Sequence, residues 1–139
     1  MFTEDEIKDY FMNQVDCGSV VAMQFESETG KTKSELMKAC GGFGGGLFCG
    51  ETCGAIAAAN VVISMIYGID EKGDEDGKVQ LIKKVTEFNE KMHEEQPSFL
   101  CKDLLGSDLQ TAAESGKMMD FCPKFCMEVT RVLKEILNS

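Results

Sequence analysis

The sequence predicts an all-α protein, a compact bundle of six or seven helices, on three observations. Apolar residues recur at three- and four-residue spacings, most regularly from Lys78 to Glu95. Capping residues such as Thr3 and helix-ending glycines such as Gly30 stand at the ends of such segments. No segment alternates apolar and polar residues as a half-buried strand would. A chain of 139 residues can bury one proper core, so residues 1–139 are predicted to form a single domain.

The first three helices are predicted from their caps. Thr3 to Glu6 forms a capping box at the start of the first helix. An aspartate caps a second helix, which begins at Cys17 and ends at Gly30. A third segment begins at Thr32 or Ser34 and ends at a run of glycines.

The central element is predicted after that glycine run. Six glycines fall among the ten residues from Gly41 to Gly50, which gives the backbone access to positive φ and to close approach by another group. Cys53 then opens an Ala-rich apolar segment, and Ala55 to Met65 carries no charged residue. Such a helix is buried on nearly every side, so we expect the others to pack around it.

The C-terminal half is predicted to contain two long helices and a short one. Lys78 to Glu95 is amphipathic and is followed by Pro97. Residues 98–106 form a short helical turn, and residues 109–117 are polar and read as a surface connection. The last helix is predicted to start at Cys122-Pro123, because proline is favourable at the first helical position. Cys126 shares its apolar face with Cys122.

Composition excludes several classes of function. The net charge is −10, with 24 acidic against 14 basic residues and no basic cluster. Nucleic acid and anionic membranes are therefore excluded as partners. The longest apolar run, Ala55 to Tyr67, is too short to span a bilayer, so no membrane insertion is expected. The acidic N-terminus lacks the features of a secretory signal, which predicts a cytoplasmic protein.

Cysteine is the unusual component of the composition. In a cytoplasmic chain, many cysteines are typical of metal or redox work rather than of structural disulfides, and an odd number argues against complete pairing. The seven are Cys17, Cys40, Cys49, Cys53, Cys101, Cys122 and Cys126.

Four of the cysteines stand where helices are predicted to start: Cys17, Cys53 and Cys122, with Cys101 in the short turn after Ser98. The N-terminus of a helix favours a thiolate over a thiol. Four converging thiolates could hold a tetrahedral metal or an iron–sulfur cluster, or could form two pairs that cycle between dithiol and disulfide. Spacing in the sequence does not choose between these. The residues predicted to contact a cofactor beside these ligands are Gly44, Gly45, Gly46, Cys49 and Gly54.

The order of these motifs resembles a known family. Asp16-Cys17, Gly42 to Gly46, Cys53-Gly54-Ala55, Cys101 to Leu104 and a late Cys122 follow the pattern of the C_GCAxxG_C_C family of redox-active proteins. The resemblance covers nearly the whole chain. The four cysteines of the family map onto Cys17, Cys53, Cys101 and Cys122, whereas Cys40, Cys49 and Cys126 are extra. One departure is Ala58, where the family pattern C-G-A-x-x-G has glycine.

The resemblance implies an electron-transfer or thiol-redox role. The family is similar to split-Soret cytochromes, in which a related domain accompanies haem and an iron–sulfur cluster. Covalent haem is not expected here, because the chain has no C-x-x-C-H motif.

Three hypotheses follow. The first is an electron-transfer centre, in which Cys17, Cys53, Cys101 and Cys122 ligate an iron–sulfur cluster or a single metal. The second is a metal-free thiol–disulfide protein that uses Cys53 with Cys49 or Cys17. The third is a non-catalytic helical binding module with buried cysteines. The expected partner is a redox protein or a small oxidant or reductant, and a homodimer is one assembly considered. The sequence does not decide whether the protein is an enzyme.

Overall fold

The computed structural model describes all residues, 1–139, and is all-α with no strand, which confirms the predicted fold class. It has more helices than the six or seven predicted, because short helices form in segments without a clear apolar pattern. The helices are α1 (Glu4–Met12), α2 (Cys17–Ala22), α3 (Glu26–Thr29), α4 (Lys33–Cys40), α5 (Gly54–Tyr67), α6 (Glu75–His93), α7 (Cys101–Leu105), α8 (Leu109–Glu114) and α9 (Lys117–Leu137), with irregular turns at Gly41–Phe43 and Gly46–Gly50.

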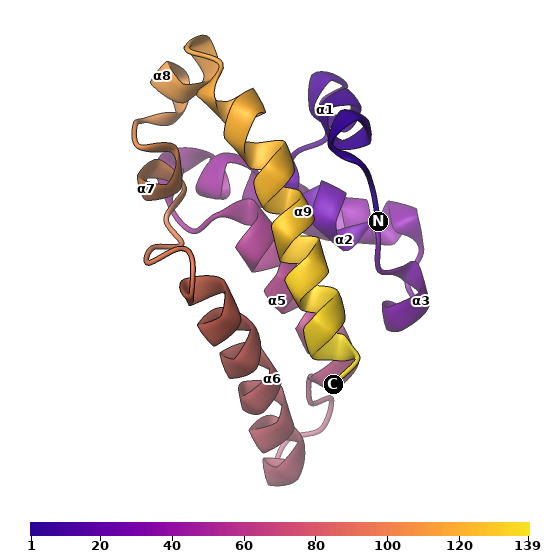
Figure 1. The fold of residues 1–139 in the computed structure, drawn as a ribbon. Coiled ribbons are helices and arrows are strands. Elements are labelled where there is room, and N and C mark those ends of the chain that lie inside the picture. The colour runs from indigo at the N-terminus through magenta and orange to yellow at the C-terminus, as the bar shows by residue number, and fades with distance from the viewer.

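Helix α5 packs against α2, α4, α6 and α9. The long α9 runs across α5, with α7 and α8 beside its beginning and α6 beside the other end of the bundle (Figure 1). The Ala-rich sequence of α5 allows these close approaches: Ala55, Ala58 and Ala59 are fully buried. At position 58 the alanine methyl therefore lies in the core.

The N-terminal caps follow the sequence closely. Thr3 and Glu6 form the predicted capping box, and Thr32 caps α4 in the same way with Glu35. The segment from Cys17 to Gly30 is two helices rather than one. The chain leaves α2 after Ala22 and re-enters a helix at Glu26, with Gly30 closing α3 at φ 72°.

The predicted beginning of the last helix is wrong. Residues 109–117, predicted as a surface connection, contain α8, which is capped by the Asp108 side chain. Helix α9 then starts at Lys117, so Cys122 and Pro123 lie inside it rather than at its N-terminus. A proline there removes one backbone hydrogen bond. The helix continues through it because Met118 and Phe121 pack against the buried residues of α7 and α8.

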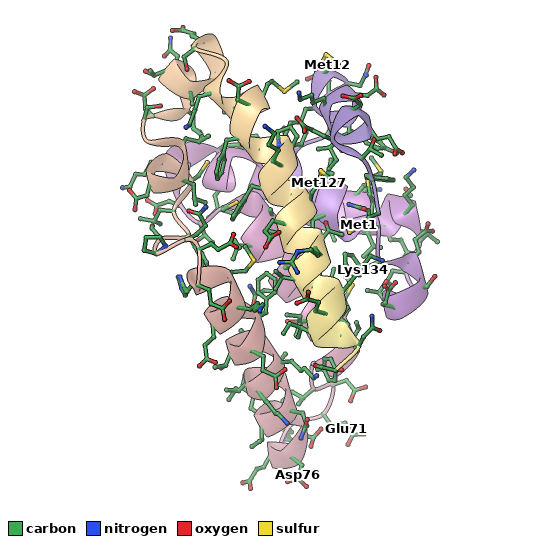
Figure 2. The ribbon with its side chains drawn as sticks, in the orientation of Figure 1. Met1, Met12, Glu71, Asp76, Met127 and Lys134 are labelled. Atoms are coloured by element: carbon green, nitrogen blue, oxygen red, sulfur yellow. The ribbon has the colours of Figure 1, made fainter.

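Acidic side chains gather at the end of the molecule where α6 begins (Figure 2). Glu71 and Asp76 lie together at the tip of the molecule where α6 begins (Figure 2). No helix in the structure combines the length and the apolar character needed to cross a bilayer.

Candidate functional site

A cavity of about 160 Å³ lies between the two apolar clusters of the protein. The larger cluster surrounds α5, and the smaller is formed by Cys101, Leu105 and Ala112. The walls are almost entirely apolar, and Asp16 is the one charged residue among them. Five cysteines line this cavity: Cys17, Cys53, Cys101, Cys122 and Cys126. The structure thus brings together the four cysteines of the predicted site and adds a fifth.

Backbone pairing places Cys53 beside Cys101. Thr52 and Leu100 form an isolated antiparallel bridge. The amide of Cys53 donates to the Phe99 carbonyl at 2.7 Å, and that of Cys101 donates to the Glu51 carbonyl at 2.6 Å. The two segments that precede α5 and α7 are therefore held together, and both thiols enter the cavity from the same side of the fold.

Cys17 lies among the other cavity cysteines. It is the first residue of α2, and its sulfur lies beside the start of α5, where a Cβ at Gly54 would be 2.7 Å away. The glycine-rich loop reaches the cavity through Gly45. The Cys126 thiol donates to the Cys17 carbonyl at 3.9 Å.

Burial raises the pKa of most cysteines, which overturns the expectation that helix starts favour thiolates here. The pKa of Cys17 is well above its usual range, because of the hydrogen bond to Cys53 and then burial. Burial, with the charge of Cys17, raises the pKa of Cys101 to about 11 and of Cys122 to about 12. The same two causes raise that of Cys126. The cost of placing an isolated negative charge in an apolar cavity exceeds the stabilisation that the helix dipole gives to a thiolate.

The reduced, metal-free protein is therefore expected to lose stability as the pH rises above about 9. Unfolding returns the pKa of Cys101 to its ordinary value of 9.0, whereas the folded value is about 11. Between these pH values the unfolded chain has released protons that the folded chain keeps, so the free energy of unfolding falls with increasing pH. Urea titrations across this range measure the fall. Cys101→Ala should show a shallower one, and an equal slope in this variant and the wild type would contradict the assignment.

Two glycines of the predicted cofactor loop leave room for site residues. A side chain at Gly44 would collide with the Asp16 carboxylate. A Cβ at Gly46, where φ is 62°, would lie 2.7 Å from the Cβ of Cys101 and closer still to the Glu51 carbonyl. Both glycines let the loop fold tightly against the cysteine-bearing elements.

Cys49 and Cys40 do not reach the cavity. Cys49 is exposed, donates to the Gly46 carbonyl at 3.6 Å and lines a separate groove with Lys102 and Asp103. Cys40 is buried at the end of α4. The structure therefore does not bring Cys49 to Cys53, the pair considered for disulfide exchange.

No three Cys, His, Asp or Glu side chains in the structure are close enough together to hold a metal ion, and all seven cysteines are free thiols.

One known protein family matches most of the chain. A family described as "putative redox-active protein (C_GCAxxG_C_C)" matches residues 15–136. The chain belongs to this family. The matched region contains all five cavity cysteines. No curated protein and no solved structure matches the chain.

Sequence reasoning missed Cys126 as a cavity residue and the Thr52–Leu100 bridge that brings the segments of Cys53 and Cys101 together. The signal for Cys126 was its position one helical turn after Cys122 on the same face. The bridge is a single residue pair, which leaves no alternating pattern in the sequence.

Proposed function

We propose that the redox activity resides in the cysteine cavity, where Cys17, Cys53, Cys101 and Cys122 hold an electron-transferring metal centre. One observation carries the proposal: cysteines from four separate parts of the chain line one apolar cavity that no Lys, Arg or His enters. Thiol chemistry between two cysteines needs one pair in contact. A cavity surrounded by sulfur on several sides is what a bound metal centre needs.

The donor set fits such a centre in its chemistry, although the sulfurs as they stand are too far apart for three of them to hold one ion. Thiolates are the ligands that soft metals and iron–sulfur clusters prefer. A bound metal cation would offset the cost of burying a thiolate. The residues that line the cavity supply no positive charge of their own. A cavity of about 160 Å³ also exceeds what a single ion requires, since a water molecule occupies roughly 30 Å³. An iron–sulfur cluster is therefore the preferred occupant, and the sulfurs would draw inward to bind it.

The chain itself contributes water exclusion and positioning. When bound, a cluster would supply one-electron transfer. The apolar walls, including Phe121 and Phe125, limit the access of water to the sulfurs, and Gly45 brings the backbone of the glycine-rich loop to the cavity. Hydrogen bonds to ligand sulfur and low solvent exposure are two of the factors that set the potential of such centres. The proposed electron partner is a redox protein or a small oxidant or reductant in the cytoplasm, where thiols stay reduced.

Contact between Cys17 and Cys53 supports a second candidate, reversible disulfide formation. In this reaction the two thiols lose two protons and two electrons to a disulfide oxidant, which is reduced to two thiols while an S–S bond forms. Cys17 and Cys53 would then be the reacting pair, without metal.

Anaerobic purification with iron, zinc and sulfide analysis and a visible spectrum tests the proposal. We expect bound iron with broad visible absorbance in the wild type, and the same in Cys49→Ala, because Cys49 lies outside the cavity. Colourless, metal-free protein after reconstitution with iron and sulfide would refute the metal centre. A loss of two thiols on oxidation, absent from Cys53→Ala, would then favour the disulfide.

A further inference from the structure

We propose that Cys126 is an alternative ligand of this centre, interchangeable with Cys122. The inference rests on the proposed function, because it concerns which sulfur of α9 completes the metal site. The family pattern asks for one cysteine in this region, and this chain has two that line the same cavity.

The placement of Cys126 carries the argument. Residues four apart on a helix lie on one face, one turn from each other, so both sulfurs project from α9 toward the same space. Cys126 is 1% exposed and borders the cavity together with Cys122. Its thiol also reaches Cys17, whose carbonyl it contacts at 3.9 Å. Cys126 therefore lies against the first residue of α2, the element that carries Cys17.

Local backbone differences suggest how the two positions could exchange. The Cys126 carbonyl accepts a hydrogen bond from the Thr130 hydroxyl at 2.8 Å, which adds to the helical bonding of that turn. Pro123 lies between the two cysteines and has no amide to donate to the preceding turn. The turn that carries Cys122 is thus held by fewer backbone hydrogen bonds than the turn that carries Cys126. A shift of the Cys122 turn would withdraw its sulfur and leave Cys126 as the α9 sulfur that borders the cavity.

The alternative is that Cys126 is a small apolar residue of the core, as buried free cysteines often are. Cys40 is such a residue in this chain, because it is fully buried and lies outside the cavity. It provides a matched control for the loss of a buried thiol.

The test compares Cys122→Ala, Cys126→Ala, the double variant and Cys40→Ala after anaerobic reconstitution. Metal stoichiometry and the visible spectrum are measured, with circular dichroism to verify folding of the metal-free proteins. We expect each single variant to keep its metal with a shifted spectrum, and the double variant to lose it. Cys40→Ala should match the wild type in stoichiometry and spectrum.

Four outcomes overturn the inference. Loss of metal from Cys122→Ala alone makes Cys126 a core residue, and loss from Cys126→Ala alone makes it an obligatory ligand; both leave the proposed function standing. Retention of metal by the double variant excludes both sulfurs as required ligands. Absence of metal from the wild type refutes the proposed function together with this inference. If the double variant fails to fold, the spectra of the folded single variants still decide the question. A shifted spectrum in both shows that both sulfurs contact the metal, and an unshifted spectrum in Cys126→Ala excludes Cys126.

Discussion

Cys17→Ala is expected to abolish metal binding, with loss of the visible absorbance and of bound iron after anaerobic reconstitution. The Cys53 thiol raises the pKa of Cys17, and the charge of Cys17 in turn raises the pKa of Cys101, Cys122 and Cys126, so Cys17 interacts with every other cavity cysteine. No sixth cysteine borders the cavity near α2 to replace it. Alanine removes the ligand without burying a hydroxyl group, which would add its own cost.

Cys40→Ala is the control for this variant, because it also deletes a buried thiol and leaves the cavity complete. It should bind metal as the wild type does. Equal iron content in Cys17→Ala and Cys40→Ala would remove Cys17 from the site.

Gly54→Ala is expected to destabilise the protein by about 3 kcal/mol, at the upper end of the usual cost of overpacking. A Cβ at this position would lie 2.7 Å from the Cys17 sulfur and closer still to the Phe43 carbonyl. The carbonyl is backbone and has little freedom to move, so α2 and the glycine-rich loop would have to separate from α5. Denaturant titrations measure the change as a lower midpoint with an unchanged slope.

Gly42→Ala, in the Gly41–Phe43 turn, is the matched control. A Cβ at Gly42 meets nothing within 4 Å, and its φ is not positive, so the change should stay within about 0.5 kcal/mol. Equal stability of the two variants would contradict the close approach of α2 to α5. If Gly54→Ala folds, it should also bind less metal, because the displaced atom is the sulfur of Cys17.

The sequence predicted the fold class because its signals were local. Spaced apolar residues from Lys78 to Glu95 define most of α6. The capping box of α1 is formed by Thr3 and Glu6, which are close together in the sequence. The convergence of the four family cysteines on one cavity followed from their motif order and could be proposed before any contact was known.

The remaining features depend on contacts between distant segments. The start of α9 was misplaced because Pro123 is a strong local signal, whereas its tolerance inside the helix depends on packing against α7 and α8. The acidity of the thiols was misjudged because helix position is visible in the sequence but burial is not. Cys17, at the first position of α2, has a raised pKa despite that position.

X-ray absorption at the metal edge of the anaerobically loaded protein tests the central claim most directly. The account predicts a first shell of about four sulfur atoms around each metal, as in cysteine-ligated centres, and loss of that signal in Cys17→Ala. Metal bound through nitrogen or oxygen alone, or a sulfur shell unchanged by removing Cys17, would contradict a metal centre in the cysteine cavity.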